Sequence, residues 1–145
     1  PGSPSEGVHP GRLFVASENG EVHALDPKTG CTYWTFKALA GVRTAPVAAV
    51  YKAANGRTRY AVYFGDGRAN SYAVDADTGL QIWTRKLDEH AHAAITGSAI
   101  VHNGRVFIGT QGLGEEDHGW HSHAAADEQG PRAFGMDLEG LAYGA

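Results

Sequence analysis

The sequence repeats with an offset of 49 residues, and this repeat restricts the possible folds more than any other feature of the chain. Residues 11–36 align with residues 59–87. The aligned pairs include Asp26 with Asp75, Gly30 with Gly79 and Trp34 with Trp83. A third copy starts at residues 104–112 and resumes at residues 134–140. A repeat of this length indicates similar structural units that bury their apolar faces against one another.

Each copy predicts three short strands, because it is dense in the β-branched and aromatic residues that strands prefer. The first strand is expected at residues 13–16, 60–65 and 105–109, the second at 22–25 and 71–74, and the third at 32–37 and 81–87. A hairpin at residues 26–30 and 75–79 joins the last two strands, with an aspartate that accepts backbone N–H bonds and a glycine that takes a positive φ. The tryptophan of the third strand is expected to dock one unit on the next.

A fourth, innermost strand is expected ahead of the second and third copies, at residues 45–51 and 97–102. Four-stranded antiparallel units that recur at about 40–50 residues with an aromatic signature are typical of β-propeller blades. The predicted fold class is therefore all-β, with four-stranded antiparallel blades of a partial β-propeller. The expected division is a tail or linker at 1–10, blade repeats at about 11–37, 45–87 and 97–145, an insertion at 113–130, and a loop between blades at 90–95.

Composition and charge exclude several classes of protein. Sixteen acidic side chains against twelve basic ones give a formal charge of −4, so no basic surface is expected to bind nucleic acid. No apolar run approaches the ~18 residues of a membrane span. Cys31 is the single cysteine, which excludes an internal disulfide, and its side chain is expected to be buried or half-buried.

The most specific strings of the chain lie in and around the repeats. The element A-[LV]-D-x-x-T-G-x-x-x-W occurs at residues 24–34 and 73–83 and resembles the repeat of quinoprotein propellers, the pyrroloquinoline quinone (PQQ) repeat. The neighbouring strings are GCTYWTF, GVRTAP, YAVYFGDGRANSYAVDADTG and HAAITGSAIVHNGRVFIG. Together they resemble the N-terminal blades of polyvinyl-alcohol-dehydrogenase-like quinoproteins, over about residues 11–112.

This resemblance implies a function for a longer parent protein. In the family, the propeller holds PQQ and a divalent cation, which we expect to be calcium, at its axis. Small or polymeric alcohols are oxidised in the periplasm, and the electrons pass to a cytochrome c. We expect the chain to be a fragment of two to three blades, inactive by itself, that packs against the remaining blades of the parent or against another copy.

The chain departs from the family pattern at three places. Residues 127–134 lack the expected vicinal cysteine pair, Ala94 stands where an arginine is expected before I-T-G, and the chain has no C-x-x-C-H haem motif. The resemblance therefore identifies no catalytic group in these residues. A second interpretation stays open, in which the chain belongs to a non-catalytic PQQ-like repeat propeller that binds protein partners, as the outer-membrane assembly scaffolds do.

The strings GVRT and AAIT enter the innermost strands and are expected to occupy equivalent places near the axis, where ligands bind in propellers. Arg43 suits a bidentate contact with a carboxylate of PQQ, and the hydroxyl of Thr44 adds a neutral contact. Thr96 and Arg68 complete the candidate cofactor-binding residues. In the structural alternative, Arg43 pairs with an aspartate of a neighbouring blade, and the hydroxyls of Thr44 and Thr96 bind loop backbone.

Asp66 and Arg68 belong to the string GDGRAN, which predicts a turn between the first and second strands of the second copy. A general base must lie within hydrogen-bond reach of the alcohol proton, and Asp66 is a conceivable carboxylate for this purpose. An aspartate flanked by glycines is more typical of a turn former, however, and an ion pair with Arg68 across the turn fits that role. We favour the turn-forming interpretation.

The inserted string GEEDHGWHSHAAADEQG combines His118, His121 and His123 with several carboxylates. Imidazole and carboxylate groups together suit zinc or another first-row metal. The spacing of the three histidines matches no specific pattern of a structural zinc site. A solvated polar loop is the favoured interpretation, and no metal site is predicted.

Overall fold

The computed structural model describes residues 9, 11–112, 132–137 and 142–143. Within these residues, all of the regular secondary structure is β-strand, as predicted. The strands are β1 (Leu13–Ala16), β2 (Glu21–Leu25), β3 (Thr32–Lys37), β4 (Val47–Lys52), β5 (Thr58–Gly65), β6 (Asn70–Asp75), β7 (Gln81–Lys86), β8 (Ile100–His102), β9 (Arg105–Thr110), β10 (Arg132–Asp137) and β11 (Ala142–Tyr143). No helix in this part of the chain is long and apolar enough to cross a membrane.

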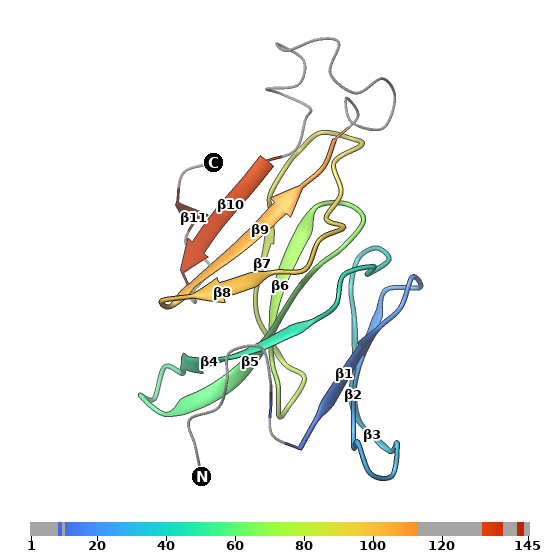
Figure 1. Ribbon diagram of the computed structural model, residues 1–145, viewed down its shortest axis with the longest axis vertical. Helices are drawn as coiled ribbons and strands as arrows, with labels where there is room; N and C mark the ends of the chain where they lie inside the picture. The colour runs from blue at the N-terminus through green and yellow to red at the C-terminus, as the bar shows by residue number, and fades with distance from the viewer. Residues whose placement is uncertain (1–8, 10, 113–131, 138–141, 144–145) are drawn as a thin grey trace.

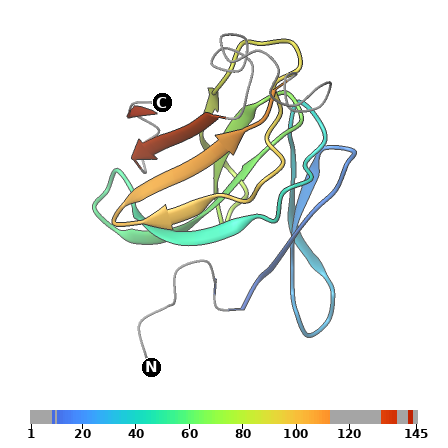
Figure 2. The same ribbon diagram turned by 45° about the horizontal axis from the view of Figure 1, so that its top comes forward.

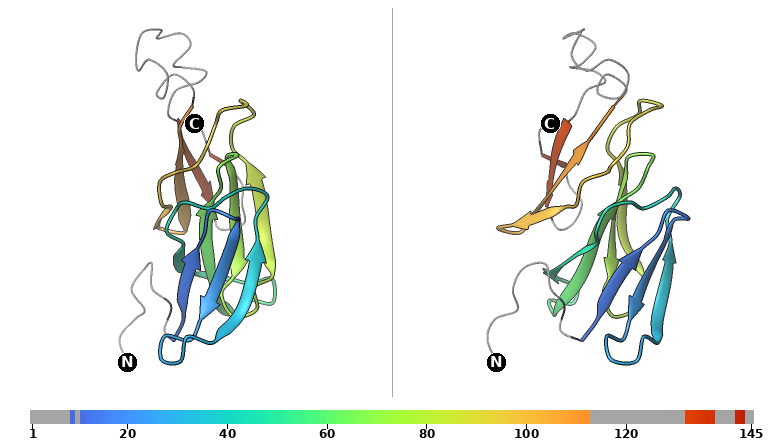
Figure 3. Two further views of the ribbon diagram at one scale, coloured as in Figure 1. Left: turned by 90° about the vertical axis from the view of Figure 1, so that its right-hand side faces the viewer. Right: turned by 45° about the vertical axis from the view of Figure 1, so that its right-hand side comes forward.

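The strands form three antiparallel sheets, which we call blades 1, 2 and 3 in chain order. Their strand orders are β1-β2-β3, β4-β5-β6-β7 and β8-β9-β10-β11. Figures 1 and 2 show blade 2 between the other two blades, and both views of Figure 3 show how the sheets are turned relative to one another. The predicted innermost strands of the second and third copies are confirmed as β4 and β8, which pair with β5 and β9.

The predicted hairpins close as expected. Oδ1 of Asp75 accepts the N–H groups of Asp77 and Thr78, both at 3.0 Å. Gly79 completes the turn with a φ of +77°, a conformation that side chains other than glycine rarely adopt. In blade 1, Asp26 accepts the N–H groups of the corresponding residues, 2.7 and 3.2 Å away.

Trp34 docks blade 1 on blade 2, which confirms the predicted role of the repeat tryptophan. Its Nε1 donates a hydrogen bond of 2.9 Å to the carbonyl of Ala76, in the hairpin of the next blade. Its ring lies so close to Gly79 that a Cβ atom there would stand 2.7 Å from Cγ of the indole. Val22 and Ala24 of blade 1 complete this contact in one apolar cluster with blade 2.

Trp83 also lies at a blade interface, one repeat later. It belongs to the second apolar cluster, in which Tyr63 of blade 2 packs with Val106 and Ile108 of blade 3. Ile95, from the linker between these blades, is 1% exposed and lies in the same cluster. Each blade interface therefore combines a tryptophan with small and branched side chains.

The expectation for Cys31 was wrong, because its side chain is exposed. Cys31 directly follows the hairpin glycine, and its counterpart in blade 2, Leu80, is 70% exposed as well. The position is therefore exposed in both copies. The inserted histidines His118, His121 and His123 lie outside the described residues.

Asp75 also holds together the strands of blade 2. Nε and Nη2 of Arg59 donate to its two carboxylate oxygens at 2.7 and 3.0 Å, and the hydroxyl of Tyr51 donates at 3.0 Å. Burial opposes ionisation of this carboxyl group, but the bonds from Arg59, Thr78 and Tyr51 outweigh it and lower the pKa of Asp75 well below its ordinary value.

We predict that acid weakens the fold through Asp75. Because its folded-state pKa lies below the unfolded value of about 3.9, its stabilising contribution is complete above that value and is lost as the pH falls through the folded-state pKa. Urea unfolding at about pH 7, 4 and 3 checks this, with Asp75→Asn as the reference variant. The difference in unfolding free energy between the two proteins should shrink with falling pH, and a constant difference would contradict the assignment.

Candidate cofactor site

The linker between β3 and β4 is fixed to the turns of two blades. Val42 donates its N–H to the carbonyl of Ser17 at 3.0 Å, and Gly41 accepts the N–H of Gly67 at 2.9 Å. Ser17 follows β1, and Gly67 lies in the turn between β5 and β6. One linker thus joins the same end of blades 1 and 2.

The linker between β7 and β8 repeats this arrangement one blade later. Ile95 donates its N–H to the carbonyl of Asp66 at 3.0 Å. Ala94 exchanges two backbone bonds with Gln111, both 2.9 Å long. Asp66 is the repeat counterpart of Ser17, so the two linkers bind equivalent carbonyl groups.

These bonds show which residues of the two linkers correspond. Val42 corresponds to Ile95, so Arg43 corresponds to Thr96. GVRT and AAIT do occupy equivalent places. An alignment of the two strings on their shared threonine, however, is wrong by one residue. The backbone bonds, rather than the identity of the side chains, set the correspondence.

Close packing keeps both linkers against the turns. A Cβ atom on Gly41 would stand 2.3 Å from the carbonyl oxygen of Glu18, and one on Gly65 would stand 2.3 Å from Cγ2 of Ile95. A side chain at either glycine would displace backbone or a buried branched residue. The glycines therefore let the linkers approach the blade ends directly.

The carboxylate of Asp66 is 0% exposed and organises the turn between β5 and β6. It accepts the backbone N–H groups of Arg68 and Asn70 at 2.9 and 3.0 Å, and the side-chain amide of Asn70 at 2.9 Å. The turn-forming interpretation agrees with these bonds. The predicted ion pair with Arg68 is absent among the described residues. Asp66 accepts the backbone N–H of Arg68 and does not pair with its guanidinium group.

The turn is anchored to blade 1 through Tyr72. Its hydroxyl donates to Oδ2 of Asp66 at 2.7 Å and accepts the N–H of Leu39, in the first linker, at 3.0 Å. Burial raises the pKa of Tyr72 well above its ordinary value, so the hydroxyl stays protonated and keeps its donor role.

A cavity of about 400 Å³ lies where the linkers meet the turns. It brings together three of the four predicted cofactor-binding residues, Arg43, Arg68 and Thr96. Glu18 and Gln111 also line it, and neither was singled out from the sequence. Glu18 and Gln111 both occupy the position that Gly67 has in the second copy. A position-by-position comparison of the three copies would therefore have identified them.

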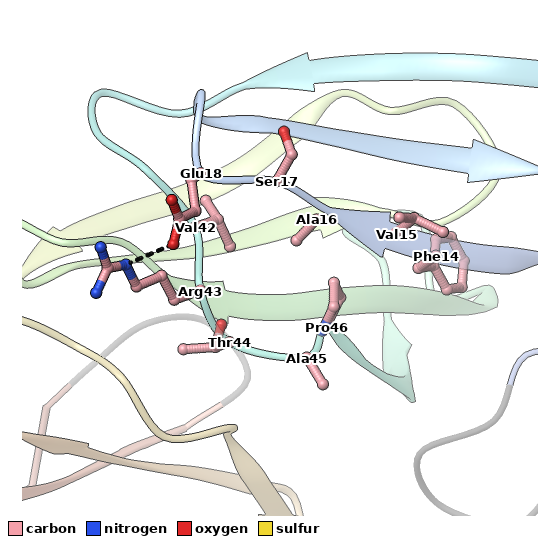
Figure 4. A pocket seen from close by; sticks show the side chains of 10 residues that line it. All are labelled: Phe14, Val15, Ala16, Ser17, Glu18, Val42, Arg43, Thr44, Ala45 and Pro46. Atoms are coloured by element: carbon pink, nitrogen blue, oxygen red, sulfur yellow. Dashed lines mark ion pairs between the residues drawn. The ribbon is translucent and has the colours of Figure 1, made fainter.

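Arg43 forms an ion pair with Glu18, with 3.1 Å between Nε and Oε1. The pairing partner is thus a glutamate of blade 1, where the structural alternative expected an aspartate. Figure 4 shows the two side chains meeting at one end of a second cavity, of about 610 Å³, with Phe14 and Pro46 toward the other end. Both side chains are more than 60% exposed, so the pair contributes little to stability.

The two predicted threonines differ in their surroundings. Thr44 is 3% exposed, and its hydroxyl lies 3.4 Å from both the N–H and the carbonyl of Gly65. Thr96 is exposed and donates to Oε1 of Gln111 at 2.9 Å. Thr44 therefore secures the linker to β5, whereas Thr96 borders the 400 Å³ cavity.

The chemistry of this cavity suits an anionic ligand. The Nε of Arg43 contacts Glu18, so the two terminal guanidinium nitrogens remain for a bidentate contact with a carboxylate of a ligand. The exposed Arg68 adds a second positive charge. The carboxylates of PQQ fit this donor set, whereas the described residues contain no group of three His, Cys, Asp or Glu side chains that would hold its cation.

Comparison with known proteins places the chain among PQQ-type repeats. A family model described as "Outer membrane protein assembly factor BamB" matches residues 2–119. A polyvinylalcohol dehydrogenase of Pseudomonas sp. is 40% identical over 97 residues, which are 67% of this chain and 15% of that protein. The chain thus spans about one seventh of this curated relative's length.

Solved structures confirm the β-propeller fold. A quinohemoprotein alcohol dehydrogenase from Comamonas testosteroni matches with a TM-score of 0.67 and 24% identity, over 95% of this chain and 20% of that one. BamB from Moraxella catarrhalis matches with a TM-score of 0.61 and 20% identity, over 93% of this chain and 33% of that one.

We predict that Asp66→Ala strongly destabilises the chain. The variant leaves the buried hydroxyl of Tyr72 and the amide of Asn70 without their acceptor, and each such loss costs about 1–3 kcal/mol. Thermal and urea unfolding measure the effect, with the exposed Glu89→Ala as control. A loss no greater than that of the control would show that the carboxylate does not hold the turn.

Proposed function

We propose that this chain, which belongs to the PQQ-repeat family whose model is described as "Outer membrane protein assembly factor BamB", forms part of the propeller of a PQQ-dependent alcohol dehydrogenase. The 40% identity to a polyvinylalcohol dehydrogenase supports this choice within the family. In this proposal, the parent oxidises small or polymeric alcohols in the periplasm and passes electrons to a cytochrome c.

The observation that carries the proposal is the cavity at the linkers, which is lined by Arg43 from the first linker and Arg68 from the turn between β5 and β6. Arg43 binds a carboxylate of PQQ through its terminal nitrogens, while Glu18 holds its Nε at 3.1 Å. Arg68 and Thr96 face the same cavity and add a positive charge and a hydroxyl group. Thr44 acts one step away, by fixing the linker to the backbone of Gly65.

The residues of this chain bind and orient the cofactor. PQQ, when bound, supplies the two-electron oxidation of the alcohol. Among the described residues, no group of three His, Cys, Asp or Glu side chains would hold the cation, which we propose to be calcium. We assign no described residue as the base that takes the alcohol proton. These groups belong to other parts of the parent. The blade boundaries at about 11–37, 45–87 and 97–145, with a tail at 1–10, are part of the same proposal.

A second candidate function is a non-catalytic scaffold that binds protein partners. The family model described as BamB favours it, and so does Ala94, which places a methyl group in the 400 Å³ cavity where the dehydrogenase pattern has an arginine. This candidate predicts no quinone binding at the linkers.

One experiment on the full-length parent distinguishes the two candidate functions. The protein is reconstituted with PQQ and Ca²⁺, and the reduction of an artificial dye is followed with primary and secondary alcohols. The dehydrogenase candidate predicts a bound-quinone spectrum and turnover, and the absence of both would reject it. We expect the 145-residue chain alone to be inactive.

We also predict that Arg43→Ala weakens PQQ binding by the parent about 10- to 100-fold, because charge-assisted hydrogen bonds contribute about 1.5–3 kcal/mol. Arg43→Lys should recover only part of the affinity, since an ammonium group lacks the planar fork. Titration of the apoprotein with PQQ gives the dissociation constants. Arg57→Ala, in the exposed hairpin between β4 and β5, is the matched control. An unchanged constant for Arg43→Ala would overturn the assignment.

A further inference from the structure

Three Asn-Gly pairs occur in the sequence, at residues 19–20, 55–56 and 103–104. In such a pair, the backbone nitrogen of the glycine attacks the side-chain amide carbon of the asparagine, because no Cβ atom hinders its approach. The attack requires that this nitrogen lose its proton and move toward the side chain. A hydrogen bond that the glycine N–H or the asparagine side chain makes in the folded protein therefore opposes the reaction.

The pair at residues 19–20, between β1 and β2, is held by hydrogen bonds. The N–H of Gly20 donates to the carbonyl of Ser17 at 3.0 Å. Oδ1 of Asn19 accepts the N–H of Glu21, also at 3.0 Å. A Cβ atom on Gly20 would stand 3.0 Å from the carbonyl oxygen of Ala40, so the first linker packs against this turn as well. The attacking nitrogen and the side chain are thus fixed by separate bonds.

The pair at residues 55–56, in the hairpin between β4 and β5, is held in the same way. The N–H of Gly56 donates to the carbonyl of Ala53 at 2.9 Å. Oδ1 of Asn55 accepts the N–H of Arg57 at 3.0 Å. Asn55 and Gly56 are both exposed, so hydrogen bonds rather than burial protect this pair.

The pair at residues 103–104 forms the turn between β8 and β9 and lacks these bonds. Asn103 and Gly104 have φ values of +49° and +72°, which are typical of a two-residue type I′ hairpin turn. His102 and Arg105 are the strand pair that closes it. Within the part of the chain that the structure describes, neither the N–H of Gly104 nor the side chain of Asn103 has a hydrogen-bond partner. Both residues are exposed to water.

The hairpin that carries Asn103 is also the least extensively paired of the three. The nitrogen of Gly104 reaches the side-chain carbon only when the turn opens locally, and such an opening costs less where fewer residues are paired. β8 pairs with β9 over three residues, whereas β4 pairs with β5 over six and β1 with β2 over four. β8 is also an edge strand of its sheet. The third pair therefore combines an unbonded nitrogen with the least restrained turn.

We propose that Asn103 is a deamidation site of this protein. The nitrogen of Gly104 gives its proton to hydroxide and forms a bond to Cγ of Asn103. The bond between Cγ and Nδ2 breaks, and the leaving nitrogen takes a proton from water and departs as ammonia. Water then opens the cyclic imide at either carbonyl carbon, which yields aspartate or isoaspartate. Nothing is oxidised or reduced, so the reaction needs only water and hydroxide.

Both products change blade 3 at its innermost strand. An aspartate at this position is the first carboxylate in residues 90–114, and isoaspartate lengthens the backbone of a turn that two residues close. β8 follows the linker in which Thr96 borders the 400 Å³ cavity. The modification therefore acts on the strand that continues this linker. Since the reaction needs neither PQQ nor an alcohol, it is independent of the proposed function.

The test follows the three asparagines separately in the full-length parent. The folded protein is kept in mildly alkaline buffer without PQQ and is then digested with trypsin, which places the asparagines on peptides 13–28, 53–57 and 87–105. Mass spectrometry measures the conversion of amide to carboxyl group in each peptide. We expect Asn103 to be converted about fivefold faster than Asn19 or Asn55, the factor that one intramolecular hydrogen bond contributes.

Two controls separate the effect of the fold from that of the sequence. In urea, the three asparagines should be converted at equal rates, since each is followed by glycine. Asn103→Gln should remove the conversion from peptide 87–105 and leave the other two rates unchanged, because a longer side chain cannot form the same ring. Equal rates in the folded parent would overturn the proposal. A faster rate for Asn103 that persists in urea would also overturn it, because a neighbouring side chain rather than the fold would then be the cause.

Discussion

The arrangement of the three blades depends on the buried carboxylate of Asp66. It closes a turn whose backbone binds both linkers, through the carbonyl of Asp66 itself to Ile95 and through the N–H of Gly67 to Gly41. Tyr72 extends the same network to the first linker. A buried charge is tolerated here because several donors surround it, and losing them would leave an uncompensated anion. The turn therefore couples the position of one blade to that of the next.

This coupling places charged side chains at a single end of the blades. Because the linker backbones are bound to the turns, Arg43 and Thr96 border the same cavity from corresponding positions. The backbone bonds between linkers and turns fix the geometry of the candidate site. The side chains that we propose to bind a ligand are exposed. Among the described residues, Arg43 pairs with Glu18 and Thr96 donates to Gln111, and in our proposal a ligand replaces these partners.

Local sequence patterns predicted the strands, the hairpins and the docking role of Trp34, because β-propensity, turn chemistry and the repeat all depend on residues close in the chain. The correspondence of Arg43 with Thr96 was not predictable in this way, since backbone bonds between separate blades set it. The exposure of Cys31 was missed because a small apolar residue at a strand start gives no sign of the direction of its side chain. Glu18 was missed because its ion pair crosses between turn and linker.

We propose that the cavity between the linkers binds the carboxylates of PQQ. The most direct measurement is an experimental structure of the full-length parent crystallised with PQQ. We expect a quinone carboxylate within hydrogen-bond distance of the terminal nitrogens of Arg43, with Asp66 still buried beneath the turn. PQQ bound at another place, with Arg43 still paired only with Glu18, would contradict it.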